Sequence, residues 1–196
     1  AAASADTHLG EFDAAEHGLS KAHQLADDQC DELVGLGIEL QVARIRGLRG
    51  DFDRGRADCL RVADLATDLG ALRVLGEAVV HLGEFCRVLG LLEESEAHLE
   101  RGERILRATG QRFTLALCLA ERTLTALARG DLQQAQYHAA GAGMAASLTS
   151  EVLLEQERVH SALGRVAEVR GDIGAAASSR AATIDCLEGQ SSYLTQ

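Results

Sequence analysis

Proline and tryptophan are absent from this 196-residue sequence, and its aromatic residues are limited to four phenylalanines and two tyrosines. So few aromatic side chains exclude base-stacking platforms for RNA and aromatic cages for quaternary ammonium ligands. The absence of proline and the scarcity of β-branched runs disfavour an all-β sandwich. With 46% apolar residues, the chain can nevertheless bury a substantial core. These features favour a helical protein rich in alanine and leucine.

Basic residues are in the minority, because 19 of them face 30 acidic residues and the net charge is −11. No block of five or six lysines and arginines occurs. The clustered positive charge that counterion release requires is therefore missing, and we expect no direct binding to nucleic acid. No run approaches roughly 18 apolar residues, and the N-terminus lacks a charged region followed by an apolar one. We expect neither a membrane span nor a signal peptide.

The five cysteines are widely separated and form no Cys-x-x-Cys pair. They are Cys30, Cys59, Cys86, Cys118 and Cys186. This pattern disfavours a disulfide framework or a zinc knuckle and indicates free, buried thiols in a reducing cytoplasm. We therefore expect a cytoplasmic protein without a metal site or another cofactor.

Glycine recurs along the chain at spacings of 40, 40, 40 and 41 residues, at Gly10, Gly50, Gly90, Gly130 and Gly171. An acidic residue follows four of the five glycines, and a large apolar residue comes next, as in Asp51 and Phe52. Small residues stand five positions after each glycine, at Ala15, Gly55, Ser95, Ala135 and Ala176. Small residues also stand seven positions before each glycine, at Ala3, Ala43, Gly83, Thr123 and Gly164.

Each of these columns has a physical role in a helical hairpin. Glycine adopts the left-handed conformation that ends a helix, and the acidic residue after it caps the next helix. The small residues allow the two helices to approach closely. Gly70 and Gly110, each twenty residues after a turn, mark the return to the next hairpin.

The spacing of apolar residues predicts a stub at 2–9 and further helices at 12–28, 31–49, 52–68, 71–89, 92–108, 112–129, 132–148, 151–170 and 173–188. Short connections make consecutive helices antiparallel, and stacked pairs form a solenoid. The predicted fold is an all-α, right-handed superhelical solenoid of about five antiparallel hairpins. It forms a single domain over residues 1–196.

Two segments carry a likeness to a known family, HLGEFCRVLGLLEESEAHLERG and ALGRVAEVRGDIGAAASSRA. Their small residue in the first helix, glycine turn and small residue early in the second helix resemble the tetratricopeptide repeat (TPR) family. The resemblance extends over nearly the whole chain. The 40-residue period resembles the repeats of large bacterial transcriptional activators and signalling ATPases. HEAT and armadillo arrays, which repeat at roughly 40–47 residues, rank second because their typical proline is missing.

Motifs for catalysis are absent from the sequence. The seven histidines are dispersed, and neither HExxH, a phosphate-binding loop nor a GxSxG elbow occurs. Glu157 and His160 have the spacing of di-iron bundle ligands, but such a bundle needs two such pairs and two further glutamates. We interpret this pair as a solvated helix face and expect no catalytic residue.

The first helix of each hairpin is expected to line a concave face suited to a peptide or a partner helix. Counting back from the turns assigns these polar residues to it: Gln41, Arg44, His81, Glu84, Arg87, Glu121, Arg158 and Arg165. The four arginines would form a positive track suited to an acidic peptide. Because aromatic residues are scarce, we expect polar and aliphatic contacts to dominate recognition. The alternative is that these are ordinary solvated helix residues.

The leading functional hypothesis is a non-catalytic scaffold that binds a protein or peptide partner. The resemblance implies an alternative, an effector-sensing regulatory domain of a larger bacterial signalling or transcription-regulating protein. A metal-dependent helical enzyme is a third and weaker possibility. Because both ends of the array lack a polar capping helix, we also expect them to be covered by a second copy or by adjoining domains.

Overall fold

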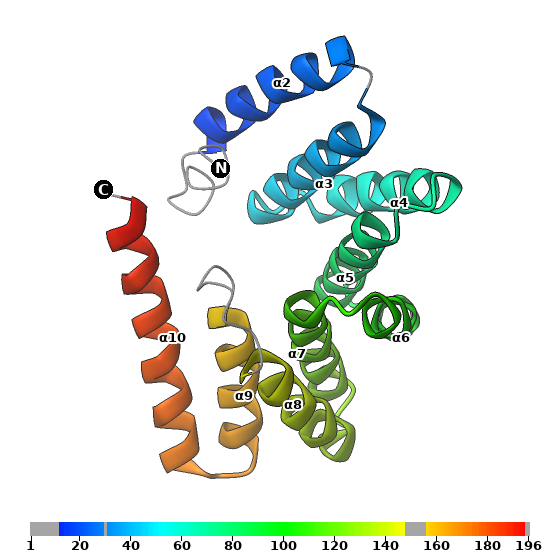
Figure 1. Cartoon of the computed structure of the whole chain (residues 1–196). Helices are drawn as coiled ribbons and strands as arrows, with labels where there is room; N and C mark the ends of the chain where they lie inside the picture. Colours follow the sequence, from blue (N-terminus) through cyan, green and yellow to red (C-terminus); the bar gives the residue numbers. More distant parts are fainter. Residues whose placement is uncertain (1–11, 30, 148–155, 195–196) are drawn as a thin grey trace.

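The structure, a computed structural model, describes residues 12–29, 31–147 and 156–194, which form α-helices joined by short connections. The helices are α2 (Phe12–Gln29), α3 (Glu32–Leu48), α4 (Phe52–Asp68), α5 (Leu72–Val88), α6 (Leu92–Thr109), α7 (Arg112–Ala128), α8 (Leu132–Ser147), α9 (Gln156–Val169) and α10 (Ile173–Leu194). They follow one another around a curved wall, with α3, α5 and α7 on its inner side and α4 and α6 on its outer side (Figure 1). The predicted all-α solenoid is confirmed.

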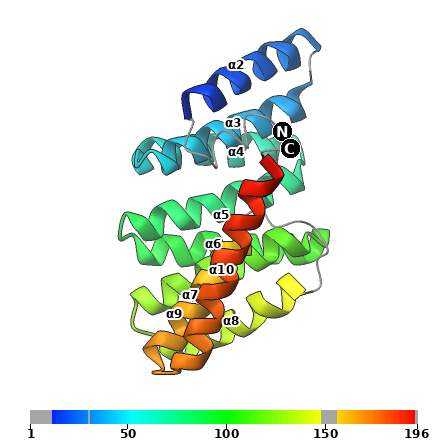
Figure 2. The ribbon, with the colours of Figure 1, turned by 90° about the vertical axis from the view of Figure 1, so that its left-hand side faces the viewer.

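Each helix packs on its neighbour in the chain, and the inner helices α3, α5, α7 and α9 also pack on one another. Viewed at 90°, the helices lie in successive layers from α2 to α9, and α10 runs obliquely across them on the viewer's side (Figure 2). The buried apolar residues accordingly form a chain of clusters between consecutive layers. This distributed core is typical of repeat architectures.

Glycines end the helices where the sequence predicts. Gly50, Gly90, Gly130 and Gly171 have φ between 73° and 87°, and Gly70 and Gly110 have φ of 65° and 70°. After α3, the Asp51 N–H donates to the Arg46 carbonyl at 2.9 Å and the Gly50 N–H to the Gly47 carbonyl at 2.9 Å. This pair of bonds is the Schellman motif.

The predicted acidic caps form at some turns and not at others. Asp131 accepts a hydrogen bond from the Gln134 N–H at 2.9 Å, and Asp172 accepts one from the Ala175 N–H at 3.0 Å. Asp51 makes no side-chain cap bond, and its carboxylate lies 3.4 Å from Arg54 Nη1 instead. The backbone geometry of the glycine turn is therefore sufficient where the cap is absent.

The two columns of small residues meet where the helices of each hairpin cross. Ser95 Oγ donates to the Gly83 carbonyl at 2.8 Å. A Cβ added to Gly55 would lie 3.1 Å from the Ala43 carbonyl oxygen. These four residues are buried, so the helices of these two hairpins pack too closely for larger side chains at Ala43, Gly55, Gly83 and Ser95.

Some predicted boundaries differ from the structure. The last helix, α10, continues to Leu194, beyond the predicted end at residue 188. The stub at 2–9 and the turn at Gly10 lie outside the described residues, as do 148–155 before α9. Cys59, Cys86, Cys118 and Cys186 are unpaired and buried, as predicted; Cys30 is outside the described part. None of the described helices combines the length and apolarity needed to cross a membrane.

Candidate binding groove

Five of the eight predicted groove residues form one network of polar contacts, which we call the concave network. Its members come from three inner helices: His81, Glu84 and Arg87 from α5, Glu121 from α7 and Arg158 from α9. The three α5 residues share a face because they are spaced by three positions, close to one helical turn. The concave network therefore joins three successive layers of the solenoid.

Glu121 is the centre of the concave network. Its carboxylate accepts hydrogen bonds from Arg87 Nε at 3.0 Å and from Arg158 Nη2 at 2.7 Å. Its side chain is 3% exposed, whereas those of Arg87 and Arg158 are 23% and 21% exposed. A buried carboxylate needs such partners, because an unpaired charge at this depth would be costly.

Glu84 is the second acceptor of the concave network. Arg158 Nη2 lies 2.8 Å from Glu84 Oε2, and His81 Nδ1 lies 3.1 Å from the same oxygen. Burial alone would raise the pKa of the Glu84 carboxyl, but Arg158 and His81 hold this pKa well below its ordinary value. Glu84 is therefore charged at neutral pH and compensates part of the arginine charge.

A cavity of about 520 Å³ opens beside the concave network, between the ends of α3 and α5 and the beginnings of α4 and α9. Its lining residues are Arg44, Gly47, Leu48, Phe52, His81, Glu84, Phe85, Val88, Glu157 and Arg158. This volume lies within the range of ligand pockets in proteins, roughly 300–1,000 Å³. The cavity combines an apolar wall with charged groups of both signs.

Two of the four phenylalanines, Phe52 and Phe85, line this cavity and form its apolar wall. The Phe52 and Phe85 rings are 6.1 Å apart between centroids, and the His81 ring stacks on Phe85 at 6.3 Å. Phe85 fits because Gly47 lacks a side chain, since a Cβ there would lie 2.7 Å from Phe85 Cζ. The sequence pattern predicted Phe52 at the corner of a hairpin, but it could not indicate that this corner borders the cavity.

The remaining predicted residues are Gln41, Arg44 and Arg165. Arg44 lines the cavity from α3, and its Nη1 donates to Gln41 Oε1 at 2.9 Å. Arg165, further along α9, is exposed and is not among the residues that line the cavity. Arg87 and Arg158 are paired with carboxylates of the concave network, so the four arginines do not share one environment.

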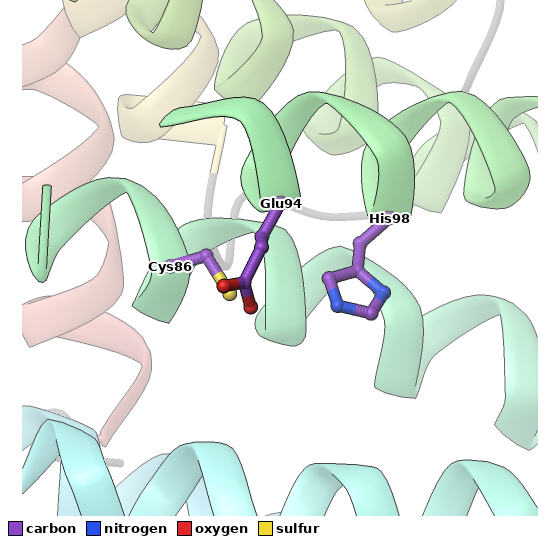
Figure 3. A group of neighbouring side chains, drawn as sticks. All are labelled: Cys86, Glu94 and His98. Atoms are coloured by element: carbon purple, nitrogen blue, oxygen red, sulfur yellow. The ribbon is translucent and has the colours of Figure 1, made fainter. Parts of the chain in front are cut away.

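A separate cluster of three potential metal-ligating side chains lies between α5 and α6. Donor atoms of Cys86, Glu94 and His98 all lie within 4.8 Å of one another. Figure 3 shows Cys86 and Glu94 pointing toward each other and the His98 ring on the same side of α6. The pair Glu157 and His160, singled out in the sequence, belongs to no such three-donor group among the described residues.

Arg56 of α4 borders this cluster. Its Nη2 donates to Glu94 Oε2 at 2.5 Å. Hydrogen bonds to Cys86 and Glu94 raise the pKa of the Arg56 guanidinium. Burial raises the pKa of the Cys86 thiol against the influence of Arg56, and burial followed by Arg56 lowers the pKa of His98. Both shifts favour the neutral thiol of Cys86 and the neutral imidazole of His98 at neutral pH.

The described helices define a TPR-like all-α solenoid, and solved structures agree with this class. BtubC (BKLC) from P. vanneervenii matches with a TM-score of 0.69 and 15% identity over 96% of this chain and 78% of that chain. A putative kinesin light chain from Podosopora anserina with nearly identical TPR-like repeats matches with a TM-score of 0.61 and 13% identity over 97% and 92% of the two chains. A point variant of that kinesin light chain matches with a TM-score of 0.63 and 14% identity over 94% and 90%. The sequence matches no protein-family model and no curated protein.

Proposed function

We propose that this chain is a non-catalytic scaffold that binds an extended peptide segment of a protein partner across its concave face. The observation that supports this proposal is the 520 Å³ cavity, in which Phe52 and Phe85 form an apolar wall beside the charged groups of Arg44 and Glu84. TPR-like solenoids commonly present such a face to partners. An apolar anchor with adjacent charged groups is the usual composition of a peptide-binding site.

The residues that line the cavity suggest which kind of peptide to expect. An apolar side chain would contact Phe52 and Leu48, and an acidic group next to it would contact Arg44, which lines the same cavity. An acidic group at Arg158 or Arg87 would compete with Glu84 and Glu121, which already hold these arginines. We therefore expect a peptide with an acidic residue beside an apolar anchor.

Selection from a phage-displayed peptide library with the purified chain tests this proposal. Peptides that bind are then measured by fluorescence anisotropy with Arg44→Glu and Leu48→Asp, which change the cavity lining. Leu48 is 56% exposed, so this substitution leaves the core intact. We expect both variants to weaken binding at least tenfold. Arg104→Glu, at an exposed position on α6, is the matched control and should bind like the wild type.

Equal binding by all three variants would remove the peptide site from this cavity. The size of the cavity also favours a second candidate, the binding of a small-molecule effector by a regulatory domain. A thermal-shift screen with charged metabolites distinguishes the two candidates. An effector would stabilise the wild type and the Arg104→Glu variant but not Arg44→Glu, and the peptide library would then yield no binder.

Exposed apolar residues near both ends of the array support the expectation that another surface covers them. Ile173, Ile184 and Leu187 of α10 are 83%, 54% and 49% exposed, and Leu25 of α2 is 61% exposed. A second copy or adjoining domains would bury these side chains. Light scattering over a range of protein concentrations tests the first possibility, and a strictly monomeric particle at high concentration would contradict it.

A further inference from the structure

We propose that Cys86, Glu94 and His98 form a binding site for a zinc ion on the α5–α6 hairpin, next to α4, and that Arg56 occupies this place when no zinc is bound. The proposal concerns a different surface from the concave groove and does not depend on the function of the groove. It rests on the geometry of the three donors and on the placement of Arg56.

The three donors are of the types that zinc prefers: one sulfur, one imidazole nitrogen and one carboxylate oxygen. They come from two helices joined by the tight turn at Gly90. Cys86 lies four residues before this glycine and Glu94 four residues after it, so the antiparallel helices place them opposite each other. Glu94 and His98 share a face of α6, because residues four positions apart are neighbours on a helix.

The distances require only a small adjustment. Zinc bonds of about 2.0–2.3 Å place the ligand atoms of a tetrahedral site about 3.3–3.8 Å apart. The present donors lie within 4.8 Å of one another. The Glu94 side chain is 49% exposed and can rotate toward Cys86 and His98 without disturbing the core. Because Glu94 borders solvent, a water molecule can supply the fourth ligand.

Arg56 shows that this place attracts a cation. Its Nη2 donates a hydrogen bond to Glu94 Oε2 at 2.5 Å, and Glu94 is one of the three donors of the cluster. However, the Arg56 Nε is buried without a hydrogen-bond partner among the described residues. The Arg56 side chain is 30% exposed, so it can move into solvent. Zinc would replace the guanidinium as the cation, and the Cys86 thiol would release its proton to solvent on binding.

The test is a zinc titration of the full chain against a chromogenic chelator. We expect the wild type to bind one zinc ion, with affinity raised about tenfold in Arg56→Gln because a competing cation is removed. Cys86→Ser and Glu94→Gln should each weaken binding at least tenfold. His160→Gln is the matched control, since its Glu-x-x-His pair lies outside the cluster, and it should bind zinc like the wild type.

A second measurement keeps the test independent of folding. Cobalt substitution should give a thiolate-to-cobalt charge-transfer band in the wild type, and this band should be absent in Cys86→Ser. Circular dichroism shows whether each variant retains its helices, and Glu94→Gln, at a half-exposed position, remains informative if Cys86→Ser unfolds. The absence of zinc binding in both the wild type and Arg56→Gln, or equal binding in Glu94→Gln and His160→Gln, would overturn the proposal.

Discussion

Replacement of Gly83 by alanine tests the close helix crossing on which each hairpin depends. An added Cβ would lie 2.5 Å from Leu99 Cδ2 and 3.1 Å from Leu99 Cδ1. Carbon atoms pack best at about 3.5–4.0 Å, so the Leu99 side chain would have to move by about 1 Å. Leu99 is fully buried, and the hydrogen bond from Ser95 Oγ to the Gly83 carbonyl fixes the separation of α5 and α6. The variant cannot relax without loosening this contact.

The magnitude follows from two opposing contributions. Overpacking a tight core costs about 1–3 kcal/mol, whereas alanine in place of glycine favours the helix by about 0.5–1 kcal/mol. The Gly83→Ala variant should therefore lose up to about 2.5 kcal/mol of folding free energy. For a domain of this size, the melting temperature should fall by up to about 10 °C. Thermal denaturation followed by far-ultraviolet circular dichroism measures this change.

Gly35→Ala is the matched control within α3, because a Cβ there meets no atom within 4 Å. Only the helix contribution remains at this position, so the melting temperature should rise by about 1–4 °C. Leu99→Ala combined with Gly83→Ala should be less destabilising than the sum of the two single changes, because the smaller side chain removes the overlap. Stabilisation by both Gly83→Ala and Gly35→Ala would refute the close crossing.

Two further predictions concern buried charged and titratable groups. Glu121→Gln leaves Arg87 and Arg158 with a neutral acceptor, and the free energy of unfolding measured by urea denaturation should fall by about 2–3 kcal/mol. The control Glu100→Gln, at an exposed position, should change this free energy by less than about 0.5 kcal/mol. Equal effects of the two substitutions would contradict the role of the concave network. Burial, followed by Arg122, lowers the pKa of His138, so the unfolded chain binds a proton more readily and stability is lost as pH falls below the ordinary histidine range. The fall in melting temperature between about pH 7.5 and 5.5 should thus be smaller in His138→Gln than in wild type, and a fall of unchanged size would contradict this assignment.

The repeat pattern predicted the fold well because its determinants are local. A glycine with positive φ is a requirement of the backbone, and Gly50, Gly90 and Gly130 meet it at the predicted turns. The positions of the small residues are also determined locally. Residues seven positions before and five positions after a turn glycine meet whenever two helices of fixed length fold back on each other. Gly83 and Ser95 show this contact directly.

The pairing of groove residues was not predictable from the same pattern. The period defines which face of a helix is inward, but it does not define the rotation between consecutive layers. Arg158 lies in the first turn of α9 and reaches both Glu121 of α7 and Glu84 of α5, and this combination depends on that rotation. Cys86 and Glu94 could have been found from the sequence, because they are equally distant from the turn at Gly90.

In the concave network, carboxylates of the chain already neutralise part of the arginine charge that a ligand would meet. A carboxylate that approaches Arg158 competes with Glu84 and Glu121, which already hold its guanidinium at 2.8 Å and 2.7 Å. Displacing Glu121 from Arg158 would leave a carboxylate with 3% exposure with Arg87 as its remaining ion-pair partner among the described residues, and this loss offsets part of the gain from a new ion pair. Under the proposed function, a ligand that leaves the concave network intact avoids this competition and contacts the apolar wall of Phe52 and Phe85. The net charge of the chain is a poor guide to recognition here, because the local pairing of each arginine decides what a ligand must displace in order to reach it.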